Sequence, residues 1–273
     1  MKEAKMNTAT MTPSEIRRLI RDGRITGPTA GMCAGYAQAN LVVLPKELAY
    51  DFLLFAQRNP KSCPLLEVSD TGERLLNTIA KGADIATDIP LYRIYRDGNL
   101  EQETTDISEY WRGDFVSFLI GCSFSFEAAL LEADIPVRHI EEGCNVPMYR
   151  TNSPCTPAGI FHGNMVVSMR PIPMELIPRS ILITGEMPRV HGFPVHIGSP
   201  ERIGIHNLGQ PDYGDMVTVR DGEVPVFWPC GVTPQAAIEN AKPPIVITHA
   251  PGHMFITDIP NAELNDYLEA KKK

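Results

Sequence analysis

The sequence contains two similar segments, and each has the pattern of a strand, a tight turn and a helix. Adding 108 to the residue numbers of segment 116–130 gives segment 224–238, and the two align without a gap. In this alignment Cys122 falls on Cys230, and Ser125 falls on Thr233. Both segments begin with an apolar run and continue into an alanine-containing helical pattern. Similarity at so long a spacing favours a fold built from two related halves over a solenoid.

Further strands are expected directly after the two helices, at residues 136–140 and 245–249. They would complete two β-turn-α-β units, with each polar turn at the carboxyl end of a strand, where open α/β sheets hold ligands. The sequence therefore predicts a mixed α/β fold, in which duplicated β-turn-α-β halves form a three-layer α/β/α core.

The segment between the two halves differs in composition and contains several prolines. Strands are expected within it at residues 165–169 and 180–184. We predict that residues 151–219 form a smaller two-layer α+β lobe. The predicted α/β core domain is then discontinuous and comprises the remaining ordered parts of the chain. Its ranges are 12–150 and 220–262, with tails at residues 1–11 and 263–273.

The overall charge excludes several classes of partner. The net charge of −8 and the pI near 5.4 disfavour binding to nucleic acid or to an anionic membrane, because an acidic surface repels phosphate. No apolar run approaches the ~20 residues that span a bilayer, and the first residues lack a secretory signal pattern. We expect a cytoplasmic protein with free thiols that binds a small-molecule carboxylate, and a homo-oligomer is compatible with the sequence.

The two turns are the predicted substrate-binding elements. Unpaired amide groups and the helix dipole both favour an anion at a helix N-terminus, so Ser123, Ser125 and Thr233 are expected to bind substrate carboxylates. Ser125 and Thr233 are the predicted N-caps of the two helices. Gln38 and Asn40 lie in a segment of small residues and amides, which is compatible either with close packing or with a substrate-lining loop.

Basic and imidazole side chains complete the predicted binding set. Arg138, Arg150 and Arg170 flank the first half and could clamp a carboxylate, although a lone arginine at a strand end is more often a surface ion pair. We expect one of them to be functional and select Arg138 or Arg170. His206, from a histidine-rich part of the predicted lobe, is a further substrate-binding candidate.

Three residues are candidates for catalysis. Glu127 or His249 could act as the base, although Glu127 could instead only complement the dipole of its helix. Cys122 could be an acid, or a nucleophile whose thiolate the helix N-terminus stabilises, but packing is the commoner role of a free cysteine. No organic cofactor is expected. Pro251 argues against a helical metal site involving His249, and a divalent metal held by histidine and aspartate stays an open alternative.

Several blocks of the sequence resemble one known family. They are TAGMCAGYAQANLVVLP, RNPKSCPLLEV, GADIATDIPLYRIYRDG, FLIGCSFSFEAAL, NVPMYRTN, VVSMRP and FWPCGVTPQ, and they lie between residues 12 and 258. The chain is similar to the family named "putative hydro-lyase" and described as D-glutamate cyclase-like. Ala86 departs from the family pattern, in which an arginine is usual at this position.

The resemblance implies a lyase that removes water, and relatives in animals are credited with closing D-glutamate to 5-oxo-D-proline. This chemistry requires a base, an acid and stabilisation of an anion, which the candidate residues could supply. The alternative is a non-catalytic binder of a small dicarboxylate or lactam metabolite. Thiol hydrolase chemistry through Cys122 is a third hypothesis.

Overall fold

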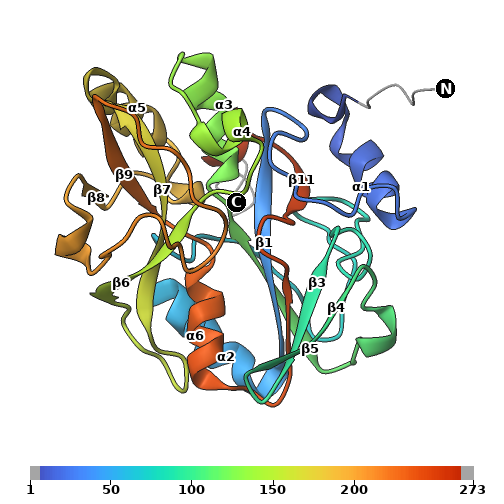
Figure 1. The fold of residues 1–273 in the computed structure, drawn as a ribbon. Helices are drawn as coiled ribbons and strands as arrows, with labels where there is room; N and C mark the ends of the chain where they lie inside the picture. The colour runs from blue at the N-terminus through green and yellow to red at the C-terminus, as the bar shows by residue number, and fades with distance from the viewer. Residues whose placement is uncertain (1–6, 266–273) are drawn as a thin grey trace.

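The computed structural model describes residues 7–265, which form two antiparallel sheets with helices packed at both ends (Figure 1). The large sheet has seven strands, in the order β2-β5-β1-β10-β3-β4, with β11 also paired to β1. The small sheet has four strands in the order β6-β7-β9-β8. In Figure 1, α3, α4 and α5 lie together at one end of the molecule, and α2 and α6 lie at the other.

The elements have the following bounds. The large sheet contains β1 (Tyr36–Pro45), β2 (Leu65–Val68), β3 (Tyr92–Arg96), β4 (Asn99–Thr104), β5 (Phe115–Gly121), β10 (Val246–His249) and β11 (Phe255–Pro260). The small sheet contains β6 (Met148–Pro154), β7 (Asn164–Pro173), β8 (His196–Ile197) and β9 (Glu223–Pro229). The α-helices are α1 (Pro13–Arg21), α2 (Lys46–Arg58), α3 (Phe124–Glu132), α4 (Arg138–Glu142), α5 (Ile177–Gly185) and α6 (Thr233–Ala241).

The central strand β1 is apolar on both faces, which is why the large sheet is covered on both sides. Leu41 and Val43 pack in the larger apolar cluster, with α3 and the inner face of the small sheet. Val42 and Leu44 point the opposite way, because side chains alternate along a strand, and they pack with α2 and α6. The two helical ends of the molecule therefore cover opposite faces of the same sheet.

Local sequence signals were reliable for several elements. The residues Thr12-Pro13-Ser14-Glu15 are typical of a capping box, and helix α1 begins with one, in which Thr12 and Glu15 each bond the backbone of the other. The pair Asp97-Gly98 is a hairpin signal, and it forms the tight turn between β3 and β4.

Two expected strands are helices. Residues 136–140 contribute to α4, which ends at Gly143 in a left-handed conformation (φ +65°). Residues 180–184 lie in α5, where the Thr184 hydroxyl donates to the Ser180 carbonyl one turn earlier. Short apolar runs fit a buried strand and a buried helix equally well, so periodicity could not separate the two.

The mixed α/β class is confirmed, but the expected β-turn-α-β units were wrong in one respect. The chain leaves β5 of the large sheet through α3 and next forms β6 of the small sheet. It leaves β9 of the small sheet through α6 and enters β10 of the large sheet. Each unit therefore connects two different sheets, and the strand pairs within both sheets are antiparallel.

The two sheets share an apolar core. Ile172 and Trp228 of the small sheet belong to the same buried cluster as Leu41 and Phe115 of the large sheet. The small sheet also combines strands from both predicted parts of the chain, because β7 lies in the predicted lobe and β9 in the predicted core domain. Between residues 7 and 265, no helix has the length and apolar character needed to cross a membrane.

Candidate functional site

The two strand-turn-helix corners share an equivalent pair of hydrogen bonds to a neighbouring strand. At the first corner, between β5 and α3, the Cys122 amide donates to the Gln38 carbonyl (3.0 Å). The Gln38 amide donates in return to the Ser125 hydroxyl (2.9 Å). At the second corner, between β9 and α6, the Cys230 amide donates to the Val166 carbonyl (3.0 Å). The Val166 amide then donates to the Thr233 hydroxyl (3.0 Å).

The strand pairs that lead into these corners also share one register. On β1 and β5, Ala39 faces Gly121 and the pairing continues to Pro45 opposite Phe115. On β7 and β9, Val167 faces Pro229 and the pairing continues to Pro173 opposite Glu223. Each corner is thus fixed by a neighbouring strand in an equivalent position.

The hydroxyls of Ser125 and Thr233 already bond the neighbouring backbone, which differs from their expected place at the helix caps. Helix α3 begins at Phe124 and α6 begins at Thr233 itself, so neither residue is an N-cap. Both side chains are 1% exposed. The structure gives these two hydroxyls a role in joining strand and helix, because each pairs an amide that would otherwise be buried without a partner.

The two corners lie close together between the sheets. Cys122 and Cys230 belong to one apolar cluster with Met148 and Met254. Gly231 lies against β1: a Cβ atom at this position would be 2.0 Å from Asn40 Nδ2. A glycine is therefore required where the second corner approaches the large sheet.

A buried ionic cluster lies at the first corner. Arg170 Nε donates to Glu127 Oε1 (3.1 Å), and Arg170 Nη2 contacts the same oxygen. His139 Nε2 lies 3.2 Å from Glu127 Oε1, without the alignment of a hydrogen bond. Arg170 also donates to the hydroxyls of Ser123 and Ser168, both at 3.1 Å. We call these five residues, Ser123, Glu127, His139, Ser168 and Arg170, the ionic cluster.

The electrostatics of the ionic cluster keep its carboxylate charged. Glu127, His139 and Arg170 are 2%, 1% and 0% exposed. Burial by itself raises the pKa of Glu127, but the neighbouring His139 and Arg170 and their contacts with the carboxylate outweigh it and lower the pKa. Arg170 is further held over the rings of Phe126 and Trp228, at 4.9 and 5.6 Å from their centroids.

His249 is a buried, neutral imidazole whose Nδ1 accepts a hydrogen bond. The Leu41 amide donates to His249 Nδ1 (3.0 Å), so the ring proton is assigned to Nε2. His249 Nε2 is buried without a hydrogen-bond partner among residues 7–265. Burial lowers the pKa of His249 to about 3, so its ring stays neutral over the physiological range. Such a ring can polarise an oxygen atom by donation, but its low pKa makes it a weak base.

The thiols behave differently from the expectation based on the helix dipole. Burial raises the pKa of Cys122 far above its usual value, although the Phe124 amide and Arg170 act in the opposite direction. Burial also raises the pKa of Cys230, to about 11. Both groups are therefore protonated thiols near neutral pH, which agrees with a packing role and not with an activated nucleophile.

The remaining predicted binding residues have partners of their own. The Gln38 side chain exchanges hydrogen bonds with Thr29, and Asn40 Nδ2 donates to the carbonyls of Ile120 and Gly121. Arg138 is 1% exposed and pairs with Glu223, so it does not join the ionic cluster.

His206 lies in a different place. It borders a separate hollow of about 280 Å³, together with Arg150 and Asp212. Arg150 in turn pairs with Glu239 of α6 and contacts the Tyr213 hydroxyl. Of the three arginines considered from sequence, Arg170 is the one that reaches Glu127.

Two members of the ionic cluster were missed from sequence. Ser168 precedes Arg170 by two positions on β7, so period-two alternation places both on one face, but the strand expected from sequence ended at residue 169. His139 was assigned to a strand that is in fact α4, so its approach to Glu127 had no local signal. Among residues 7–265, no group of three or more His, Cys, Asp or Glu side chains is arranged to hold a metal ion.

Comparison with known proteins identifies the family. The model of the D-glutamate cyclase family matches residues 116–258, which include both corners and the ionic cluster. A protein of Clostridium beijerinckii is 67% identical over 259 residues, covering 95% of this chain and 99% of its own length. A Bacillus subtilis protein is 62% identical over 254 residues, covering 93% and 99%. Both relatives carry the name "putative hydro-lyase".

This chain therefore belongs to the D-glutamate cyclase family. Its relatives' names support a lyase of the hydro-lyase class. Among solved structures, a nitrogen repressor-like protein from Methanococcus jannaschii shows a weak likeness, with a TM-score of 0.38 and 10% identity over 92% of this chain and 99% of that one.

Proposed function

We propose that this protein is a hydro-lyase that closes D-glutamate to 5-oxo-D-proline with loss of water. Family membership and the relatives' names support the reaction class. The observation that carries the proposal is the buried ionic cluster at the first corner, where an arginine, a carboxylate and an imidazole meet beside the second corner. Such groups can bind a carboxylate, carry a proton and stabilise an anion.

The reaction requires no oxidant or second reactant. The substrate α-nitrogen attacks the γ-carboxyl carbon, forming a C–N bond, and one γ-oxygen leaves after the C–O bond breaks. The ammonium group gives up two protons, which leave with that oxygen as water. Holding the α-nitrogen and the γ-carboxyl carbon in reacting geometry lowers part of the barrier, and proton transfer and oxyanion stabilisation must lower the rest.

Within the proposal, three residues have distinct roles. His139 carries the proton from the nitrogen to the leaving oxygen, and Glu127 orients its imidazole from 3.2 Å. Arg170 stabilises the oxyanion of the tetrahedral intermediate. This assignment moves Glu127 from the expected base to a positioning residue, because a carboxylate with a lowered pKa is a weak base.

The proposed duplication of the two halves also has structural support. The equivalent hydrogen bonds of Ser125 and Thr233, and the shared register of β1 with β5 and of β7 with β9, are what two copies of one corner would produce. In this proposal, only the first copy carries the ionic cluster, since position 235, the equivalent of Glu127, is a glutamine.

The test is to incubate the purified protein with D-glutamate and to follow 5-oxoproline by liquid chromatography and mass spectrometry, with and without divalent metals. L-Glutamate is the matched control substrate. The proposal expects product from the D-enantiomer and its loss in His139→Gln, whereas His162→Gln, at an exposed position, keeps activity. If no product forms under any of these conditions, D-glutamate is not the substrate. Calorimetric binding of D-glutamate without turnover would favour the non-catalytic binder.

A further inference from the structure

A basic hollow lies on the surface between α1 and the loop that contains Lys81. Its volume is about 360 Å³, which is within the range of small-ligand sites. It is bordered by Ser14, Glu15, Arg17, Arg18, Arg21, Lys81, Gly82 and Ala83. None of these residues belongs to the corners or to the ionic cluster.

The charge of the basic hollow is opposite to that of the whole protein. Four of its bordering residues are cationic and one is a carboxylate, in a chain whose formal net charge is −8. Arg18 and Arg21 are exposed on α1, three residues apart and therefore neighbours on the helix surface. Lys81 is exposed on the facing loop. A concentration of positive charge in a concave place attracts small anions from solution.

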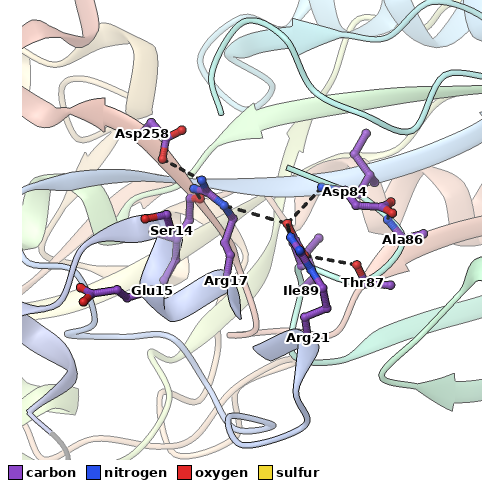
Figure 2. A network of polar contacts seen from close by, with 12 residues as sticks. Ser14, Glu15, Arg17, Arg21, Asp84, Ala86, Thr87, Ile89 and Asp258 are labelled. Carbon is purple, nitrogen blue, oxygen red and sulfur yellow. Dashed lines mark hydrogen bonds and ion pairs between the residues drawn. The ribbon is translucent and has the colours of Figure 1, made fainter. Parts of the chain in front are cut away.

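Two of the arginines are fixed from behind by carboxylates. Arg21 forms a bidentate pair with the fully buried Asp88, at 2.8 and 2.7 Å. Arg17 is 4% exposed, donates to the Ile256 carbonyl (2.8 Å) and pairs with Asp258 (2.8 Å). Figure 2 shows Arg17 reaching toward Asp258 on one side, with Arg21 on its other side. These contacts preorganise the floor and one wall of the hollow.

The other two cations that border the hollow are Arg18 and Lys81. Between residues 7 and 265, neither Arg18 nor Lys81 forms an ion pair with a carboxylate. Lys81 stands on a loop closed by backbone bonds, because the Leu76 amide donates to the Ala83 carbonyl and the Gly82 amide to the Leu76 carbonyl. Arg18 and Lys81 thus border one hollow from two ordered elements, and Glu15, one turn before Arg18, is the carboxylate nearest to them in that border.

We propose that the basic hollow is a second ligand site, which binds a small doubly charged oxyanion such as a phosphate group or a dicarboxylate. Arg18 and Lys81 supply the charge-assisted hydrogen bonds to the anion, and Arg17 and Arg21, whose charges are balanced by Asp258 and Asp88, give the hollow a fixed border. The site is independent of the proposed reaction, since its residues lie outside the ionic cluster.

The experiment is isothermal titration of the full-length protein with inorganic phosphate and, separately, with glutarate, at low ionic strength. The double variant Arg18→Ala, Lys81→Ala is compared with Lys46→Ala, Arg202→Ala, which removes the same charge from two exposed positions elsewhere. We expect binding of at least one anion to weaken about tenfold or more in the first variant. The control should stay within about twofold of the native protein, as should the melting temperatures of both variants in anion-free buffer.

Three results would overturn the proposal. They are no binding of either anion by the native protein, equal weakening in the two double variants, and unchanged binding in the Arg18, Lys81 variant. If the Arg18, Lys81 variant weakens the binding of phosphate alone, the hollow takes a phosphate-bearing ligand, and if it weakens the binding of glutarate alone, the hollow takes a dicarboxylate. D-Glutamate turnover is measured in the same samples, so failure of this site and failure of the proposed reaction remain distinguishable.

Discussion

At the scale of single residues, the ionic cluster is the part of the molecule most sensitive to substitution. Glu127→Gln would leave Arg170 buried without its counter-charge, and such changes cost about 3–5 kcal/mol of unfolding free energy. The matched control is Glu132→Gln, on an exposed position of the same helix, for which we expect a change within about 0.5 kcal/mol. Chemical denaturation of both variants measures the difference. Equal stabilities would show that Glu127 does not balance the buried charge of Arg170.

The buried histidines predict how stability depends on pH. The pKa values of His191 and His249 are lowered to about 4 and about 3, whereas an unfolded histidine titrates near 6.5. Below about pH 6.5 these two histidines therefore bind protons in the unfolded chain, whereas in the folded chain they stay neutral until about pH 4 or 3. Stability must fall as the pH drops through this window, by about 1.4 kcal/mol per pH unit for each histidine.

Single variants measure this slope directly. The unfolding free energy of His191→Gln, followed between about pH 6 and 5, should depend less steeply on pH by about 1.4 kcal/mol per unit. His249→Gln should have the same effect, and the exposed His162→Gln serves as the matched control. A slope in His191→Gln identical to that of the native protein would show that this ring is charged, or accessible, in the folded state.

Some residue-level features could be found from sequence and others could not. Glu127 and Arg170 were selected because a charge beside a helix N-terminus and an arginine near a strand end are local patterns. Their contact across 43 residues is not local, and neither is the approach of His139. Of the roles considered for Cys122, the structure favours packing over a nucleophilic thiolate, because burial, which depends on the whole fold, outweighs the helix dipole and raises the pKa of the thiol.

At the scale of elements, the corners make a prediction about two hydroxyls. Ser125→Ala and Thr233→Val each leave a backbone amide, of Gln38 or Val166, buried without its acceptor. Each loss costs about 1–3 kcal/mol, and the two costs should be similar because the corners are equivalent. Thr233→Ser is the matched control, since it retains the hydroxyl. Thermal and chemical denaturation provide the measurement.

The same variants separate a structural role from the expected binding role. If Ser125→Ala unfolds at the native denaturant concentration but no longer binds substrate, its hydroxyl serves the ligand and not the backbone. The hydrogen bond from the Gln38 amide to the Ser125 hydroxyl would then contribute little to stability.

Elements with strong local signals were predicted correctly, and elements defined by burial were not. The capping box at Thr12 and the turn at Asp97 and Gly98 act within a few residues. The helices at 138–142 and 177–185 contain short apolar runs whose conformation is decided by what packs on them. The sheet to which a strand belongs is also decided by distant residues. The hydrophobic pattern of the sequence therefore could not predict that α3 and α6 each connect strands of different sheets.

At the scale of the whole molecule, the shared core predicts cooperative unfolding. The two tryptophans report on different parts: Trp111 packs edge-on against Phe115 of the large sheet, and Trp228 lies in the small sheet. In Trp111→Phe, fluorescence follows only Trp228, while circular dichroism follows the whole chain. We expect coincident denaturation midpoints, because both sheets contribute to one apolar cluster. Separate midpoints would instead show that the small sheet, which contains Trp228, unfolds independently of the rest of the chain.

The pairing of β1 also has a consequence for how the chain is made. This early strand lies between β5 and β10 and also pairs with β11, near the end of the described chain. On the ribosome, β1 can pair with β5 after about seventy further residues, but β10 and β11 follow only after about two hundred. Contacts of such long sequence separation form slowly. The nascent protein thus carries an apolar strand with one unpaired edge for most of its synthesis, and we expect a chaperone that holds such strands to raise its yield in cell-free translation.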